Sequence, residues 1–490
     1  MIFSRMPVSR LPARLAVGMN LSSLCSDASM EVGLIALDRR DRPVLSICLT
    51  HLLGDCLTIW PQVTEGPILT EQIDKADIFT DTSLIDDPYP YFNALRSQCP
   101  VHPISQPGVL AVTGYDEAVE VYRNDAVFSS CNAMGGPFPP FPVEPGTDDI
   151  TDQVQSNREH WVFNEFMVTK DGPEHEAERS LLRRLLTPKR LKENEAEMAG
   201  MADEVLDGFL DRGHCELVTD YAKPFTTMAI ADLLGIPDED REHFRKIFTG
   251  QHVAAVGSDS PLPDNPLEYM YETFGSYIED RRLNPRDDVL TALATSTYPD
   301  ESLPDVGAIV RLATFLFGAG QDTSARLMGS ALRILADDQD LQTQLRTDLR
   351  RVPDFIEEVL RMESPTMSDF RMTQKRTRLG GVEVAAGTTI MLHPGASNRD
   401  PRHFPEPDTF RLNRENVREH IAFGRGVHSC PGGPLARAEG RVTIERFLAR
   451  TSTLTVSTEH HGPAGARTFR HDPTYIIRGL SDLYLEFTPA

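Results

Sequence analysis

The fold of this chain is decided by residues 423–432, which read Phe423-Gly424-Arg425-Gly426-Val427-His428-Ser429-Cys430-Pro431-Gly432. Glycines here allow backbone conformations that other residues avoid, and they let a flat molecule approach the main chain. Pro434 then opens a helical pattern, as proline does in a first helical turn. Cys430 therefore lies just before a predicted helix N-terminus, where the helix dipole and free N–H groups favour a thiolate.

A lone cysteine in such a loop has two interpretations, a buried structural thiol beside a turn or a metal ligand. Zinc would need further ligands at close spacing, but no C-x-x-C pair exists among the other cysteines, Cys25, Cys48, Cys56, Cys99, Cys131 and Cys215. Haem iron needs only one cysteine ligand. The sequence therefore favours haem held by Cys430.

The stretch from Asp305 to Asp337 has apolar residues at helical spacing and no proline, which predicts one helix about 50 Å long. Gly320 near its middle costs roughly 1 kcal/mol against alanine, and the pair Asp322-Thr323 follows within an apolar run. We expect the Thr323 hydroxyl to bond back to the carbonyl four residues earlier, which bends the helix and leaves room for dioxygen and water. The alternative is a local irregularity with a satisfied threonine.

Two pairs of charged side chains share helix faces. Glu358 and Arg361 are three residues apart on a helix predicted between Pro353 and Pro365, and an exposed pair of this kind contributes little. His175 and Arg179 are one turn apart, just after the helix-starting Pro173, with two solvated side chains as the alternative.

Together these motifs resemble those of the cytochrome P-450 family. The family's haem signature, Phe-x-x-Gly-x-x-x-Cys-x-Gly, is met at Phe423, Gly426, Cys430 and Gly432. Its Glu-x-x-Arg motif and its oxygen-activating acid-alcohol pair stand upstream in the family's order, and the resemblance covers roughly residues 77 to 490. Three independent motifs in register make chance agreement implausible.

The resemblance implies a role for each of these residues. Cys430 would be the axial ligand of haem b, with Phe423 and Gly432 in its loop, and Asp322 and Thr323 would deliver protons to dioxygen. The Glu358–Arg361 pair would be buried and bind an arginine of a downstream loop, for which Arg411 is the candidate. The haem propionates would be held by His175, Arg179, Arg371 and His428.

The function that the resemblance implies is a soluble, bacterial-type monooxygenase that inserts one atom of dioxygen into an apolar organic substrate. Electrons would come from NAD(P)H through a separate ferredoxin or similar donor, because the sequence shows no flavin or ferredoxin domain. Two alternatives stay open: a peroxide-driven peroxygenase and a non-catalytic haem-binding protein. Each would have less need of Asp322 and Thr323.

The fold expected is mainly α with a minor β part, in which a single large haem domain spans residues 76–490. Alternating apolar runs predict strands near residues 109–113, 382–392 and 483–487. Residues 1–75 are interpreted as an extension of unknown role, disordered in part or the product of a misassigned start codon.

The formal net charge of −24 argues against binding to nucleic acid. Unpaired cysteines suggest a reducing compartment, and the uncharged stretch of residues 43–53 is too short to span a bilayer. We therefore expect a cytoplasmic protein without stable membrane insertion. Arginines around the Cys430 loop predict a basic patch for an acidic ferredoxin, unless they are ordinary surface residues.

Overall fold

The computed structural model of the 490-residue chain describes residues 31–37, 43–48, 76–143, 146–237, 240 and 268–490. The chain divides into two compact units, residues 1–72 and 73–490. In the first unit, strands β1 (Glu31–Leu37) and β2 (Pro43–Cys48) pair antiparallel. The expectation of disorder in residues 1–75 falls almost wholly outside the described residues.

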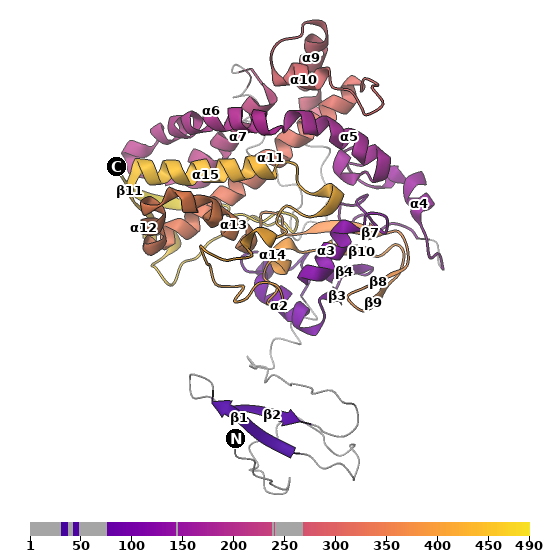
Figure 1. The fold of residues 1–490 in the computed structure, drawn as a ribbon, viewed down its shortest axis with the longest axis vertical. Coiled ribbons are helices and arrows are strands. Elements are labelled where there is room, and N and C mark those ends of the chain that lie inside the picture. The colour runs from indigo at the N-terminus through magenta and orange to yellow at the C-terminus, as the bar shows by residue number, and fades with distance from the viewer. Residues whose placement is uncertain (1–30, 38–42, 49–75, 144–145, 238–239, 241–267) are drawn as a thin grey trace. The chain divides into compact units, whose positions relative to one another are not determined.

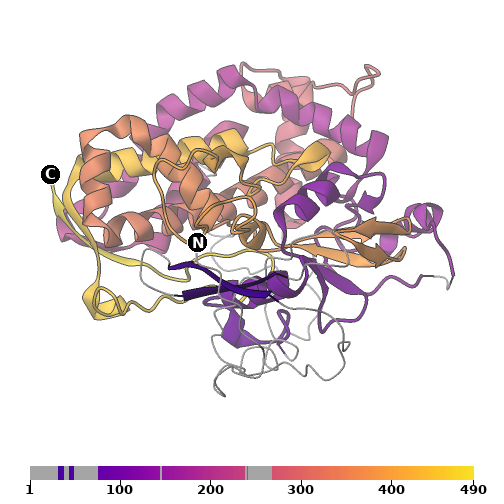
Figure 2. The same ribbon diagram turned by 60° about the horizontal axis from the view of Figure 1, so that its bottom comes forward.

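Helices are the main regular structure of residues 73–490, and most of the long ones gather on one side of this unit. The larger sheet lies on the other side, beside α2 and α3 (Figures 1 and 2). The helices up to residue 294 are α2 (Tyr89–Gln98), α3 (Tyr115–Arg123), α4 (Thr151–Ser156), α5 (Gly172–Leu185), α6 (Pro188–Asp207), α7 (Lys223–Leu234), α9 (Glu268–Leu283) and α10 (Val289–Ala294). Those that follow are α11 (Val306–Asp337), α12 (Gln339–Thr347), α13 (Val352–Met362), α14 (Pro394–Ser397), α15 (Gly433–Arg450) and α16 (Thr458–His461).

Helix α11 is the centre of the helical side and confirms the prediction of one long helix. The Asp305 carboxylate caps it by accepting a hydrogen bond from the Ala308 N–H at 2.8 Å. Buried side chains along its length, such as Ile309, Phe317 and Leu332, belong to the largest hydrophobic cluster. Helices α7, α9 and α15 pack against it, so α11 is held from several sides.

The larger sheet has the strand order β3-β4-β10-β7-β5, where β10 runs parallel to β4 and antiparallel to β7. Its strands are β3 (Val101–Pro103), β4 (Val109–Val112), β5 (Phe128–Ser129), β7 (Asp369–Thr373) and β10 (Thr389–Leu392). A second sheet has the order β11-β12-β6, and β8 pairs with β9. These strands are β6 (His214–Glu216), β8 (Thr377–Leu379), β9 (Val382–Val384), β11 (Thr451–Val456) and β12 (Tyr484–Pro489).

The predicted mainly-α fold with a minor β part is confirmed, but one predicted strand is wrong. The run of residues 382–392 forms two strands, β9 and β10, which belong to different sheets. Gly387 stands between them at φ +84°, a conformation that reverses the chain and that residues with a Cβ rarely adopt. In the part of the chain that the structure describes, no helix is long and apolar enough to cross a membrane.

Candidate active site

The loop that carries Cys430 is folded tightly against its own start. The Cys430 N–H donates to the Phe423 carbonyl at 2.8 Å, and a short 3-10 turn, Gly426–His428, lies between them. Gly426 has φ +73°, and a Cβ there would collide with the Tyr122 carbonyl of α3. Only glycine fits that place, because both the backbone angle and the close approach exclude a side chain.

Cys430 and Thr323 line the same cavity, of about 310 Å³, although they come from different elements. Most of the other lining side chains are apolar and include Met134, Met167, Val168, Leu182, Ile230, Leu312, Phe315, Leu316, Ala319, Leu435 and Ile476. A thiol on the wall of an apolar cavity that is also lined by Thr323 of α11 matches the arrangement that the sequence predicts. Such a cavity suits a flat apolar group together with an apolar ligand.

The Cys430 thiol opens into this cavity, which accounts for its exposure within the folded chain. Burial by the surrounding protein raises its pKa, while the Gly432 and Gly433 N–H groups and Arg179 act in the opposite direction. The N–H groups at the helix N-terminus therefore lower the pKa of Cys430 as predicted, but burial raises it by more. Metal coordination would favour the thiolate form of Cys430, since a cysteine ligand loses its proton when it binds a metal.

Donor groups for an anionic ligand collect at the cavity. Arg179, Arg371 and His428 line it, and the His175 ring lies against the His428 ring with centroids 4.0 Å apart. Arg179 donates to the Ser429 carbonyl, which ties α5 to the Cys430 loop. Arg371 donates to Asp369 Oδ1 at 2.7 Å.

Two of these donors have buried atoms without a hydrogen bond. Among the described residues, His175 Nε2 and His428 Nε2 find no hydrogen-bond partner, although His428 Nε2 lies 3.4 Å from Asp171 Oδ1. Burial, with His428 and Arg179 nearby, lowers the pKa of His175 to about 4, so the neutral imidazole is a donor rather than a cation. Buried atoms of this kind normally have partners. The thiol, the apolar wall and these donors on one cavity therefore fit the binding of haem.

Thr323 and Asp322 differ in their surroundings. The Thr323 hydroxyl donates to the Ala319 carbonyl at 2.8 Å, which confirms the predicted bond to the residue four positions earlier. Asp322 is not among the cavity-lining residues, and its side chain is 37% exposed and accepts from Arg326 Nε at 2.9 Å. The structure therefore places the alcohol at the cavity and the acid toward solvent.

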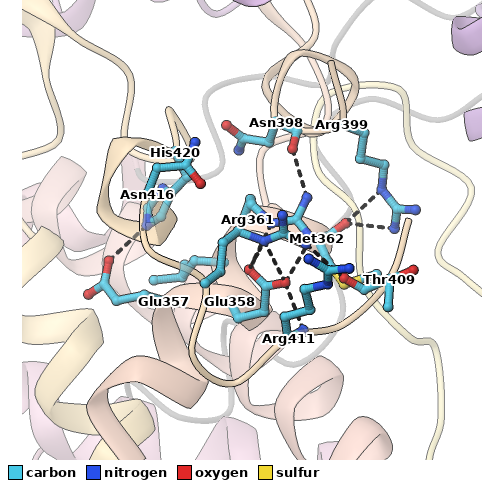
Figure 3. A network of polar contacts seen from close by, with 12 residues as sticks. Glu357, Glu358, Arg361, Met362, Asn398, Arg399, Thr409, Arg411, Asn416 and His420 are labelled. Carbon is cyan, nitrogen blue, oxygen red and sulfur yellow. Dashed lines mark hydrogen bonds and ion pairs between the residues drawn. The ribbon is translucent and has the colours of Figure 1, made fainter. Parts of the chain in front are cut away.

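The Glu358–Arg361 pair is fully buried, with Arg361 Nε and Nη2 donating to the two carboxylate oxygens at 2.8 and 2.9 Å (Figure 3). The prediction that the Arg411 side chain joins this pair is wrong. Arg411 gives only its backbone N–H, at 3.0 Å, while its guanidinium pairs with Glu406. Arg414 supplies the second guanidinium instead, because the loop turns back and brings the later arginine inward.

This network reaches the Cys430 loop through Asn398. Arg361 Nη1 donates to the Asn398 carbonyl at 2.9 Å, and the Asn398 side-chain oxygen accepts from the Ile421 N–H at 2.7 Å. Ile421 stands two residues before Phe423, where the loop begins. Nothing in the sequence around Asn398 indicates this role, since it depends on contacts between segments far apart in the chain.

A second network, around the buried carboxylate of Glu357, contacts Phe423. Arg437 donates to Glu357 Oε1 at 2.5 Å and lies over the Phe423 ring at 4.6 Å, while His420 lies 2.9 Å from Glu357. Burial alone would raise the pKa of Glu357, but hydrogen bonds from His420 and Arg437 bring it down to about 2. The carboxylate therefore stays charged and fixes the arginine that covers Phe423.

Comparisons with known proteins agree with this site. A family model described as Cytochrome P450 matches residues 264–464. The substrate-free structure of Mycobacterium marinum cytochrome P450 CYP150A6 is 54% identical, covers 85% of this chain and 100% of its own, and superposes with a TM-score of 0.80. Cytochrome P450 144 of Mycobacterium tuberculosis is 33% identical over 400 residues, 77% of this chain and 86% of that protein. Steroid C26-monooxygenase of Mycolicibacterium smegmatis is 29% identical over 390 residues, 78% of this chain and 88% of that protein.

The fold and the site define a haem-thiolate class of oxidoreductase. The chain belongs to the cytochrome P450 family. It is accordingly a monooxygenase that uses haem iron and electrons that originate in NAD(P)H and arrive through partner proteins.

Proposed function

We propose that Cys430 is the axial ligand in a monooxygenase that oxidises an apolar organic molecule. The observation that carries this proposal is the shared cavity, whose wall includes both the Cys430 thiol and the Thr323 hydroxyl. When bound, haem supplies the iron at which dioxygen is activated. The Cys430 thiolate would hold the iron and would supply the electron density that favours O–O cleavage.

Four side chains are proposed to orient the haem through its propionates: His175, Arg179, Arg371 and His428. Arg179 and Arg371 line the cavity as cations, although Arg371 also pairs with Asp369, and His175 Nε2 is a buried ring nitrogen without a hydrogen bond. His428 lines the cavity and lies 3.4 Å from Asp171 Oδ1. Charge-assisted hydrogen bonds of this kind are about twice as strong as neutral ones. Together these side chains would hold the propionates and so orient the haem in the cavity.

Asp322 and Thr323 are proposed to move protons inward. The exposed Asp322 carboxylate takes a proton from solvent, and the Thr323 hydroxyl passes protons on at the cavity through ordered water. The Thr323 hydroxyl donates to the Ala319 carbonyl, and this bond would fix the orientation of the hydroxyl at the cavity. A positioned proton donor is worth roughly 10²–10⁴-fold in the step that it serves.

The electron donor is proposed to be an acidic ferredoxin that docks near the Cys430 loop. Val427 in that loop is 48% exposed, and Arg425 beside it donates to a carbonyl rather than to a carboxylate. Arg437 and Arg441 contribute less positive charge than the sequence suggests, because Glu357, Glu195 and Glu445 pair with them. We further propose that residues 76–490 form the haem domain and that the protein is cytoplasmic, in accord with the free cysteines Cys99, Cys131, Cys215 and Cys430.

The experiment is the spectrum of the reduced carbonyl complex for the wild type, Cys430→Ser and the matched control Cys99→Ser. A thiolate ligand gives a red-shifted band, which we expect in the wild type and in Cys99→Ser only, because a hydroxyl is a poor soft donor. Retention of the band in Cys430→Ser would reject Cys430 as the ligand. NADH oxidation with a surrogate ferredoxin and reductase, compared with peroxide alone, separates the monooxygenase from the peroxygenase and the non-catalytic carrier.

A further inference from the structure

Arg326 lies one helical turn after Asp322 on α11 and is shared between two carboxylates. Its Nε donates to Asp322 Oδ2 at 2.9 Å, and its Nη1 lies 2.9 Å from Asp472 Oδ2. The Arg326 side chain is only 6% exposed, against 37% for Asp322 and 17% for Asp472. A buried cation therefore joins the solvent-facing acid to a segment near the C-terminus.

That segment is a closed loop of residues 471–480, here called the 471–480 loop. His471 and Leu480 form an antiparallel bridge at its base, and the Asp472 N–H donates to the Gly479 carbonyl at 3.1 Å. At its far end Ile476 lines the cavity, and the Ile476 carbonyl accepts from the Met367 N–H at 2.8 Å. The loop thus contacts the cavity at one end and Arg326 at the other.

Gly479 gives a second and independent sign that the loop is fitted around Arg326. A Cβ at position 479 would lie 2.9 Å from Arg326 Cβ and 2.9 Å from Nη1, closer than real Cβ contacts. Any side chain at this position must therefore displace the arginine. Glycine leaves the space through which the arginine reaches Asp472.

We propose that Arg326 is a positioning residue for proton delivery and that Asp472 controls how firmly it holds Asp322. The proposal rests on the role proposed above for Asp322, which takes a proton from solvent, passes it inward and returns to the carboxylate. Because one guanidinium serves two carboxylates, each weakens the hold of the other. When Asp472 is lost, Arg326 pairs with Asp322 alone. This stronger pairing restrains the Asp322 carboxylate and slows proton transfer.

The test uses the haem-loaded full chain with saturating spinach ferredoxin and its reductase, without added substrate. The rate of NADH consumption is measured in H₂O and in D₂O for Asp322→Asn, Asp472→Asn, Arg326→Gln, Arg326→Lys and the double variant Asp472→Asn/Arg326→Gln. The midpoint of thermal unfolding is recorded for each protein as a measure of structure alone. Arg333→Gln is the matched control, because Arg333 lies on the same helix and pairs with Glu363 at 3.2 Å.

We expect Asp472→Asn to lower the rate roughly 3- to 10-fold and to raise the solvent isotope effect, as a coupled pair that limits a proton step should. Once Arg326 is Gln, adding Asp472→Asn should change neither quantity further. Arg326→Lys should restore part of the coupling, since it keeps the charge but has a single ammonium. Arg333→Gln should alter the unfolding midpoint without altering the isotope effect.

A purely structural role would shift unfolding midpoints in Asp472→Asn and Arg326→Gln while the isotope effect stays at its wild-type value, and that result overturns the proposal. Effects of the two substitutions that simply add would also overturn it, because Arg326 would not then connect the two acids. An unchanged rate in Asp322→Asn is a different outcome: it removes the role proposed for Asp322 itself, and this inference falls with it. Gly479→Ala offers a check with every charge retained, and should change the isotope effect in the same direction as Arg326→Gln.

Discussion

Arg414 Nε lies 3.1 Å from each carboxylate oxygen of Glu358, and both side chains are buried. The same guanidinium donates to the carbonyls of Pro405 and Thr409 at 2.6 and 2.9 Å. Arg414 therefore closes its own loop and at the same time ties that loop to α13. Such a group contributes through satisfied polar contacts as much as through charge.

Arg414→Ala should destabilise the fold by about 3 kcal/mol, because removal of one partner leaves a buried carboxylate short of a cation. Arg361 still pairs with Glu358, which keeps the cost near the lower end of the range for broken buried pairs. The midpoint of thermal unfolding of the haem-loaded protein measures this effect.

Arg411→Ala is the matched control. Its backbone N–H bond to Glu358 survives the substitution, and its side chain is 41% exposed, so little change is expected. A larger loss of stability in Arg411→Ala than in Arg414→Ala would contradict the network described here.

Arg411 and Arg414 illustrate which features of the site can be predicted from the sequence and which cannot. Short-range features were predictable, because the Cys430 loop and the Thr323 bond to Ala319 depend on residues a few positions apart. The choice of Arg414 over Arg411 was not, since both stand in one loop and only its path in space decides which points inward. The contact between Asp472 and Arg326 could not be predicted for the same reason, because it depends on the path of the 471–480 loop in space.

Thr323→Ala should retain haem binding and yet divert reducing equivalents to peroxide. The Thr323 hydroxyl lies at the cavity and directs protons in the proposed mechanism. It has no proposed role in holding the cofactor. Loss of one positioned donor typically costs ~10²–10⁴-fold in its step. Peroxide formed per NADH consumed is the measurement, and Thr323→Ser, which keeps a hydroxyl, should stay close to the wild type. An unchanged ratio in Thr323→Ala would exclude the proton role.

Deletion of residues 1–75 should leave a folded haem protein. The chain divides near this point into two compact units, and every described residue that lines the cavity belongs to the second. We expect the Soret band and the reduced carbonyl band to be unchanged in the truncated protein. Loss of haem would show that the first unit contributes to the binding site.

Glu439 of α15 has a raised carboxyl pKa, which makes folding stability depend on pH. The residue is fully buried, and burial raises the pKa of its carboxyl to about 8, which the neighbouring Ser324 side chain opposes without cancelling. The unfolded chain should titrate this group near its ordinary value of 4.5. Between these two values the folded protein holds a proton that the unfolded chain has lost, so folding stability falls as pH rises.

Each pH unit in that window costs about 1.4 kcal/mol, and the cost is complete above a pH of about 8. Glu439→Gln has no proton to lose and should therefore gain stability relative to the wild type as pH rises from about 5 to about 9. Thermal unfolding midpoints of the two proteins across this range measure the difference. Glu445→Gln is the control, because Glu445 lies on the same helix but is partly exposed and pairs with Arg441. If the difference between Glu439→Gln and the wild type were constant with pH, Glu439 would not be protonated in the folded protein at neutral pH.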